Sequence, residues 1–334
     1  MRAEHPDRVW LDGVVRAIDA WLDAPVTTPT SQLAGGGAIA RGEERLSARH
    51  EGRPALLVPS ATYALWVALR ALGVRAGDEV LVPRHDWTSS LAVVLALGAV
   101  PVIVPADPAT LTIDPEAAAA RATARTRALI ATHLLGVPAD VPALRAALPR
   151  VPIVEDCAQA FGSTLDGRPV GVFGDAAILS FGPGKRIDVG ELGALVLRDG
   201  ELRRRALQEA AHPVRQRMDG IVPPAPAGVS IRPHPLAAVL LDAALDADDA
   251  AALIQGRRRL AARVARSADL PLVGVDARRG VASATIPVLA DTVDEGMLPA
   301  GILLGHGAVD DIASVRDGSP TSLPLLLIAE GGVR

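Results

Sequence analysis

The chain has 334 residues, 49% hydrophobic and 22% charged, a balance that fits one large globular domain with a smaller second one. Its formal net charge of −4 gives no electrostatic attraction to nucleic acid or to an anionic membrane surface. The single cysteine cannot form an internal disulfide, the N-terminal segment MRAEHPDRVW is charged where a signal peptide is apolar, and no apolar run is long enough to span a bilayer. We therefore expect a cytoplasmic protein with no nucleic-acid or membrane partner.

The first predicted element is an amphipathic helix over Pro6–Asp23, where apolar residues recur at helical spacing. The glycines at 35–37 predict a flexible loop, because neither a preceding strand nor a following Gly-Lys-Ser/Thr supports a phosphate-binding function. Next come a strand over Pro54–Val58 and a helix over Tyr63–Leu72, joined by a turn that contains Ser60 and Thr62. Two interpretations of this turn stay open: its hydroxyl groups cap the helix, or its backbone N–H groups bind a phosphate.

Short apolar strands then alternate with helical segments as far as Val154. The strands are predicted at 80–83, 100–104, 128–133 and 151–154, and the helices at 84–97, 115–124 and 141–148. This alternation predicts an α/β fold with a doubly wound, mostly parallel sheet and helices on both of its faces. Trp87 falls at a strand-to-helix junction, where packing is the usual function of a tryptophan, and His85 is interpreted as a loop residue.

Asp156 follows directly after the apolar run Val151–Val154, so its carboxylate lies where a buried strand stops. The carboxyl ends of the strands border the ligand crevice in open α/β sheets. This position predicts that Asp156 meets a ligand, and the charge of the ligand group would be positive. No metal site is predicted.

Lys185 is the only lysine of the chain and follows a turn rich in glycine and proline. A lysine amine forms a Schiff base with a carbonyl group and an arginine cannot, which gives a chemical reason to retain one lysine. The alternative is a gene that prefers arginine codons and left one lysine by chance. The neighbouring Asp156 motif favours a catalytic lysine.

The stretch that holds Asp156 and Lys185 resembles the DegT/DnrJ/StrS family of pyridoxal-phosphate-dependent sugar aminotransferases. The resemblance extends over roughly Leu33–Leu245 and rests on four ordered motifs at the family's spacing. These are Glu155-Asp156-Cys157-Ala158-Gln159-Ala160, Gly171-Val172-Phe173-Gly174-Asp175, Ser180-Phe181-Gly182-Pro183-Gly184-Lys185 and Gly190-Glu191-Leu192-Gly193-Ala194.

The resemblance implies a fold-type-I transferase with pyridoxal 5′-phosphate as its cofactor. It implies that Lys185 holds the cofactor, that Asp156 keeps the pyridine nitrogen protonated and that Gln159 bonds the phenolic oxygen. Trp87 would stack on the ring, and Ser180 with the Ala61–Thr62 turn would hold the phosphate. The implied reaction transfers an amino group from glutamate or glutamine to a keto-sugar nucleotide or a related cyclic ketone, in a homodimer that serves a biosynthetic pathway.

The part of the chain beyond His212 departs from the family pattern. Ser230 stands where the family has an asparagine that reaches the phosphate of the neighbouring subunit, whereas Arg232 is retained. Two more helices are predicted at 235–245 and 248–267 and a few strands near 282–289, and the tail is short for the family. We expect a large cofactor-binding domain with an N-terminal helical segment at 1–245 and a small α+β domain at 246–334. Two alternatives stay open: a pseudoenzyme or partner subunit, and another pyridoxal-phosphate reaction on an unusual amine.

Overall fold

The computed structural model describes residues 15–16, 18–19, 35–225, 229–265 and 272–282, together with the backbone of strands 285–289, 302–309 and 323–330. The helix predicted over Pro6–Asp23 lies almost wholly outside the described residues. Internal contacts divide the chain into two compact units. Unit 1 comprises Met1–Ala71 and Ile178–Asp248, and unit 2 comprises Leu72–Ala177 and Asp249–Arg334. The domain division at residue 245 stays a prediction.

A mostly parallel sheet confirms the predicted α/β class, and its strand order is β1-β9-β8-β5-β4-β2-β3. Within unit 2, β2 pairs in parallel with β3 and β4, and β4 pairs in parallel with β5. In unit 1, β1 and β9 are antiparallel. The strands span Ala55–Val58 (β1), Glu79–Pro83 (β2), Val100–Val104 (β3), Thr126–Thr132 (β4), Ile153–Asp156 (β5), Ala176–Ser180 (β8) and Gly193–Leu197 (β9).

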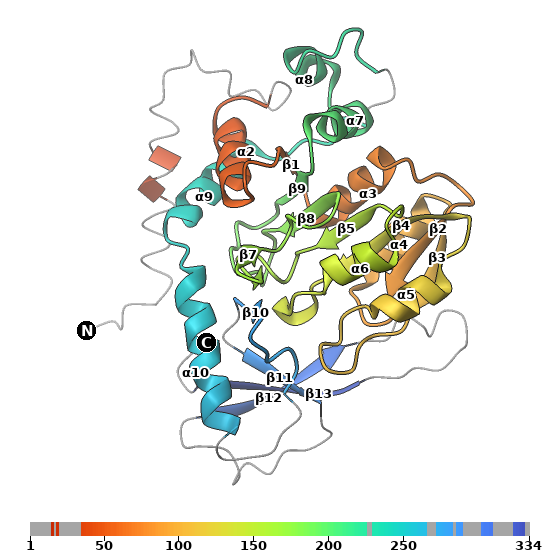
Figure 1. Ribbon diagram of the computed structural model, residues 1–334. Helices are drawn as coiled ribbons and strands as arrows, with labels where there is room; N and C mark the ends of the chain where they lie inside the picture. Colours follow the sequence, from red (N-terminus) through yellow and green to blue (C-terminus); the bar gives the residue numbers. More distant parts are fainter. Residues whose placement is uncertain are drawn as a thin grey trace. The chain divides into compact units, whose positions relative to one another are not determined.

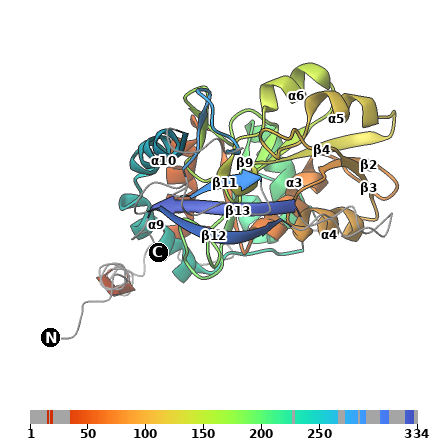
Figure 2. The same ribbon diagram turned by 90° about the horizontal axis from the view of Figure 1, so that it is seen from below.

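Helices cover both faces of the part of the sheet that belongs to unit 2. Figures 1 and 2 show α4 (Thr88–Ala96) on one face and α5 (Pro115–Arg121) with α6 (Val141–Ala147) on the other. Asp114 and Asp140 cap α5 and α6 by accepting the N–H groups of Ala117 and Ala143, and a proline in the first turn of each helix needs no such acceptor.

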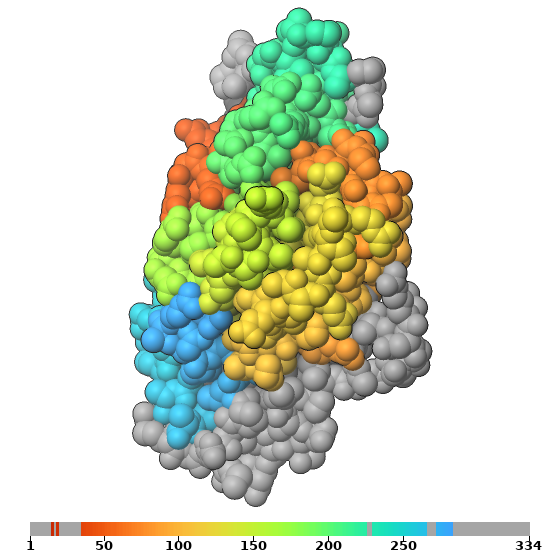
Figure 3. All heavy atoms as spheres, turned by 45° about the vertical axis from the view of Figure 1, so that its right-hand side comes forward, coloured from red at the N-terminus to blue at the C-terminus, as the bar shows by residue number. Residues whose placement is uncertain are grey.

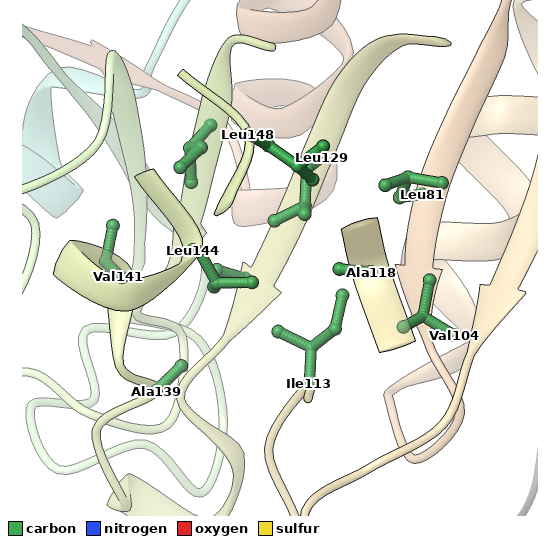
Figure 4. Packing of buried hydrophobic residues seen from close by; sticks show 11 residues of the cluster. Leu81, Val104, Ile113, Ala118, Leu129, Ala139, Val141, Leu144 and Leu148 are labelled. Carbon is green, nitrogen blue, oxygen red and sulfur yellow. The ribbon is translucent and has the colours of Figure 1, made fainter. Parts of the chain in front are cut away.

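The core of unit 2 lies between α5, α6 and the sheet. Figure 4 shows Val141 and Leu144 of α6 facing Leu129 of β4, with Ala118 of α5 close to Val104 of β3. These side chains are buried, and the apolar runs within β2, β4 and β5 place hydrophobic residues on both faces of the sheet, which is the pattern of a parallel sheet between two helical layers. In the space-filling view of Figure 3 the segment that contains α5 and α6, in yellow, covers this core.

In the part of unit 1 that the structure describes, helices α2, α3 and α7 pack on β1 or β9. Helix α3 packs on β9 and α7, and α2 lies along α9. Arg45 of α2 donates to Asp242 of α9 over 2.7 Å, an ion pair that ties segments almost two hundred residues apart. The helices are α2 (Ala38–Arg49), α3 (Ala61–Ala71), α7 (Gly200–Ala210), α8 (Pro213–Met218) and α9 (Pro235–Asp246).

The remaining elements belong to unit 2. Helix α10 (Ala250–Ala265) and the short helix η1 (Leu134–Gly136) accompany two small sheets. One joins β10 (Arg279–Gly280), β6 (Thr164–Leu165) and β7 (Arg168–Pro169), and in the other β13 (Leu323–Glu330) lies between β11 (Thr285–Leu289) and β12 (Ile302–Val309), as Figure 2 shows. The sequence predicted neither β12, β13 nor α8. In the described part of the chain no helix is both long and apolar enough to cross a membrane.

We expect Leu144→Ala to lower the free energy of unfolding by about 3 kcal/mol, because it leaves a cavity in the fully buried cluster of Figure 4. Leu95→Ala on the exposed side of α4 is the matched control and should cost less than about 1 kcal/mol. Urea denaturation followed by circular dichroism measures both. Equal losses in the two variants would contradict this account of the core.

Candidate active site

Two neighbouring strand ends in unit 2 place polar side chains on opposite faces of the sheet. Thr132 of β4 is the register partner of Asp156 of β5, and His133 donates its backbone N–H to the Asp156 carbonyl over 3.0 Å. Successive side chains of a strand point to opposite faces. Thr132 and Asp156 therefore share one face, and His133 and Glu155 share the other.

The Glu155 face forms a closed hydrogen-bond network. The Glu155 carboxylate, which has no exposure, accepts the N–H groups of Gly171, Phe173 and Gly174. His133 accepts the Ala139 N–H at Nδ1, so its proton is on Nε2, which donates to Glu155 over 3.1 Å. Both ring nitrogens of His133 thus have partners, and His133 is a structural histidine.

The pKa of Glu155 is lowered although its burial acts to raise it. Desolvation is the largest contribution, and it is outweighed by the hydrogen bond from His133 together with the N–H donors of Gly174 and Gly171. Glu155 is therefore ionised in the folded protein. Its negative charge fixes the loop over 171–174 against the end of β5.

His133, Glu155 and Cys157 bring three potential metal-binding atoms within 4.8 Å of one another. The two oxygens of Glu155 and both ring nitrogens of His133 already have partners. Burial, followed by the charges of Glu155 and Asp156, raises the pKa of the Cys157 thiol well above its usual value, which keeps the sulfur in its weakly binding neutral form. This cluster therefore stabilises the fold and is not a metal centre.

The Asp156 face contains a second buried carboxylate, Asp86, just before α4. Burial, followed by the charge of Asp156, raises the pKa of Asp86 to about 7, and the nearby hydroxyl groups of Ser90 and Thr132 offset part of the rise. Among the described residues, Asp86 Oδ2, Ser90 Oγ and Thr132 Oγ1 are buried and lack a hydrogen-bond partner of standard geometry. Such atoms are rare in a folded interior and indicate a place for a polar ligand.

Trp87 and Gln159 present ligand-binding groups in the same unit. The Trp87 side chain is 67% exposed, whereas its backbone N–H donates to Asp86 Oδ1 over 2.7 Å. The Leu135 N–H donates to Gln159 Oε1 over 2.7 Å, and this bond leaves the Nε2 group of Gln159 as the end available for a ligand. A donor at this position matches an acceptor such as a phenolic oxygen.

In unit 1, the turn before α3 is fixed from two directions. The Ser60 hydroxyl accepts the Tyr63 N–H at 3.4 Å, so Ser60 caps the helix, as one of the two interpretations predicted. A Cβ atom at Gly193 would lie 2.2 Å from the Ser60 carbonyl carbon, which means that only glycine allows β9 to approach the turn. The first N–H groups of α3, at Ala61 and Thr62, have no acceptor within the helix and are the donors that suit a phosphate.

Lys185 lies half-buried in the loop that follows β8. The loop is closed by the Asp188 carboxylate, which accepts the N–H groups of Gly184 and Gly190, and by backbone bonds of Phe181 to Val189 and Leu192. Its conformation thus does not depend on the lysine amine. Ser180, at the end of β8, precedes this loop and is also half-buried.

The predicted site residues divide between the two units. Asp156, Trp87 and Gln159 belong to unit 2, whereas Ala61, Thr62, Ser180 and Lys185 belong to unit 1. The sequence analysis missed Asp86, Ser90 and Thr132. The available signal was an aspartate within a buried segment at a strand end, the same signal that identified Asp156.

A cavity of about 430 Å³ within unit 1 is lined by ion pairs of its own. Glu43 accepts Arg215 Nη2 at 2.7 Å and the Leu57 N–H at 3.0 Å, and Arg215 also donates to Asp219 at 2.7 Å. Burial raises the pKa of Glu43, and Arg215 offsets part of this effect. A side chain at Gly35 would overlap the Arg215 guanidinium group, so the charges of this cavity serve the packing of unit 1.

The family model of the DegT/DnrJ/EryC1/StrS aminotransferases matches residues 25–293. The chain belongs to this family. The match extends beyond the region of resemblance noted in the sequence and includes α9 and α10.

Two curated relatives illustrate the similarity. The L-glutamine:scyllo-inosose aminotransferase of Streptomyces griseus is 45% identical over 156 residues, which cover 46% of this chain and 37% of that protein. The 3-amino-5-hydroxybenzoate synthase of Amycolatopsis mediterranei (strain S699) is 41% identical over 169 residues, which cover 50% of this chain and 44% of that protein. The chain thus matches less than half the length of these curated relatives.

Solved structures are similar over more of the chain. A crystal structure of 3-amino-5-hydroxybenzoic acid synthase has a TM-score of 0.72 and 32% identity, covering 85% of this chain and 74% of that chain. DesV of S. venezuelae, in complex with a ketimine intermediate, has a TM-score of 0.77 and 28% identity, covering 97% and 90%. The fold is that of the aminotransferases.

We expect Glu155→Gln to lower the free energy of unfolding at pH 7 by about 3 kcal/mol, because an amide cannot accept all the bonds that the carboxylate accepts. A lowered pKa stabilises the folded state above the unfolded-state value of about 4.5, and this contribution disappears as the pH falls through the folded-state pKa. The difference between wild type and variant should therefore shrink in acid. Glu116→Gln, on the exposed side of α5, is the control, and a loss as small as that of the control would show that Glu155 does not hold the loop.

Proposed function

We propose that this protein is a pyridoxal-phosphate-dependent aminotransferase that transfers an amino group from glutamine or glutamate to a cyclic ketone or keto-sugar nucleotide. The main support is Lys185, the only lysine of the chain, which lies in a loop that needs no contact from its amine. The family match supports the reaction class. The relative from Streptomyces griseus is named for L-glutamine and scyllo-inosose, which makes glutamine the preferred donor in this proposal.

The residues of both units fit pyridoxal phosphate. The three buried polar atoms beside Asp156 suit a polar ring edge, and the free N–H groups of α3 suit a phosphate. The exposed indole of Trp87 suits a flat aromatic ring. When bound, this cofactor supplies an aldehyde that condenses with amines and a ring that accepts electrons from the reacting carbon.

Each residue then has a defined task in the proposed reaction. Lys185 Nζ would hold the aldehyde carbon and, once displaced by the donor amine, carry the proton between the two reacting carbons. The Asp156 carboxylate would keep the ring nitrogen protonated. The remaining residues would bind and orient: Gln159 Nε2 at the phenolic oxygen, Trp87 on one ring face, and Ser180, Ala61 and Thr62 at the phosphate.

The proposed assembly is a homodimer in the cytoplasm. The segment that would cross to the neighbouring subunit contains Arg232, which is exposed, and Ser230, which has a left-handed backbone with φ of 56°. Asparagine and glycine are the residues that adopt this backbone most readily. Ser230 thus retains a backbone conformation that suits the asparagine of the family pattern, and this supports a conserved course of the chain there.

We expect Lys185→Ala to remove the visible absorbance of the lysine-bound cofactor and to lower the turnover rate by at least about a hundredfold. Lys185→Arg is the matched control, since it retains the positive charge but cannot form a Schiff base. Borohydride reduction and peptide mapping of the wild type check the assignment. Because the chain has one lysine, all label should be found on one peptide, and label elsewhere would refute the role of Lys185.

Asp156→Asn should leave cofactor binding largely intact, because the phosphate and stacking contacts remain. The half-reaction with L-glutamine should slow by about a hundredfold or more, since the ring nitrogen loses the charge that keeps it protonated. Stopped-flow absorbance measures the rate of this half-reaction in the wild type and in Asp156→Asn. Equal rates in wild type and variant would remove Asp156 from this role, and a wild type that reacts with no amine donor would favour a pseudoenzyme.

A further inference from the structure

Two side chains from one segment of unit 2, Gln159 and Ser163, both bind the short helix η1. Gln159 Oε1 accepts the Leu135 N–H over 2.7 Å, and the Ser163 hydroxyl donates to the Gly136 carbonyl over 2.9 Å. Ser163 has no exposure, and its hydroxyl also accepts the Ala282 N–H over 3.0 Å. Ser163 thus joins η1 to a segment 119 positions further along the chain.

The backbone of η1 has a conformation that its surroundings must impose. Leu135 has a left-handed backbone with φ of 54° and ψ of 25°, which a leucine rarely adopts. Such a conformation persists where the contacts around it determine it. Gly136 follows with φ of 80°, and a Cβ atom there would lie 3.2 Å from the Gln159 carbonyl oxygen and 3.3 Å from Val281 Cγ1. The close approach of these two neighbouring segments therefore holds η1 in this form.

Strand β10 and the residues after it also pack on η1. Val281 belongs to a buried apolar cluster with Leu134, and Leu135 packs against this cluster. Arg279 donates to the Pro138 carbonyl, just after η1, over 2.8 Å. The position of η1 is therefore fixed by contacts that do not involve the Gln159 side chain.

The amide group of Gln159 takes its orientation from η1. This group has an acceptor end, Oε1, and a donor end, Nε2. The Leu135 N–H can bind only the acceptor, so it commits Oε1 and leaves Nε2 for a ligand. A displacement of η1 would remove this preference for one orientation of the amide.

We propose that Ser163 is a positioning residue of the cofactor site. It holds η1 in place, so that the Leu135 N–H keeps Gln159 Nε2 directed at the phenolic oxygen of the bound ring. This inference rests on the proposed function for the identity of the ring. It extends the site beyond the residues that touch the cofactor, to the hydroxyl group that joins η1 and Ala282.

The expected consequence is a change in the proton affinity of the lysine-bound cofactor. A donor at the phenolic oxygen favours the negative charge of that oxygen and thus lowers this proton affinity. Gln159→Leu removes the donor and should raise the proton affinity about tenfold. Ser163→Ala leaves the amide in place without a fixed orientation, and should raise the proton affinity at least about threefold.

The first experiment follows the absorbance of the lysine-bound cofactor against pH in the wild type, in both single variants and in the double variant. Because Ser163 acts through Gln159, Ser163→Ala should add nothing further once Gln159→Leu is present. The matched control is Thr126→Ala, which also removes a hydroxyl group, one that accepts the Thr123 N–H over 2.8 Å at the other end of β4. This control should titrate as the wild type does.

Each outcome of this titration has a defined meaning. A wild-type titration curve in Ser163→Ala, together with a shifted curve in Gln159→Leu, overturns the inference and leaves the proposed function intact. A shift from Ser163→Ala that persists in the double variant also overturns it, since Ser163 would then act by another route. No lysine-bound absorbance in the wild type overturns the proposed function, and with it the ring on which this inference rests.

The second experiment needs no cofactor and measures hydrogen exchange at the Leu135 N–H. Both Gln159→Leu and Ser163→Ala should raise the exchange rate by about tenfold or more, because the first removes the acceptor and the second releases η1. Thr126→Ala should leave the rate unchanged. A rate in Ser163→Ala equal to that of the wild type contradicts the hold of Ser163 on η1.

Ser163→Cys is the second variant, in case Ser163→Ala does not fold. A thiol is a weaker donor and acceptor than a hydroxyl, so it should hold η1 less firmly while filling the buried space. Its absorbance titration and its Leu135 exchange rate should lie between those of the wild type and Gln159→Leu. Wild-type values for both measurements overturn the inference.

Discussion

The alternation of side chains at the ends of β4 and β5 is the constraint on which unit 2 depends. A slip of one residue would exchange the two faces, placing Glu155 with Asp86 and leaving Asp156 against the backbone donors of the loop over 171–174. The bonds of Glu155 to His133 and to that loop oppose such a slip. The ionised Glu155 therefore fixes the face to which Asp156 points.

The two faces of these strand ends have opposite energetic character. On the Glu155 face every charge has donors, so the pKa is lowered and the network stabilises the fold. On the Asp156 face, Asp86 has its pKa raised and the buried oxygens of Asp86, Ser90 and Thr132 lack partners of standard geometry within the described residues. Groups that are poorly satisfied in the free protein concentrate where a ligand binds. This contrast within one pair of strands separates the structural carboxylate, Glu155, from Asp156, the carboxylate that we propose binds the cofactor.

The sequence predicted the fold class, and it pointed to the proposed site residues where the signal was local. The motifs around Asp156 and Lys185 are continuous in the chain, and the alternation of apolar strands with helices identified the α/β class. Strand β5 begins and ends two residues later than predicted, because an apolar run does not show where pairing stops and β5 continues through Glu155 and Asp156.

Features that depend on distant segments were not predicted. The Glu43–Arg215 ion pair joins residues 172 positions apart. The raised pKa of Asp86 depends on its burial and on the charge of Asp156, which belongs to another strand. Strand β13, LPLLLIAE, is a continuous apolar run whose periodicity is the same for a buried strand and a buried helix. For these elements, tertiary pairing and not local pattern decides the structure.

The central claim is that the chain transfers an amino group, and isotope transfer tests it most directly. The protein with pyridoxal phosphate is incubated with glutamine labelled with ¹⁵N at the α-amino group and with scyllo-inosose, the ketone named for a relative. Mass spectrometry of the cyclitol product follows the label. The account predicts an aminated cyclitol that contains one ¹⁵N atom. Label that stays entirely in glutamine, with this ketone and with a panel of keto-sugar nucleotides, in a protein that binds the cofactor, would contradict it.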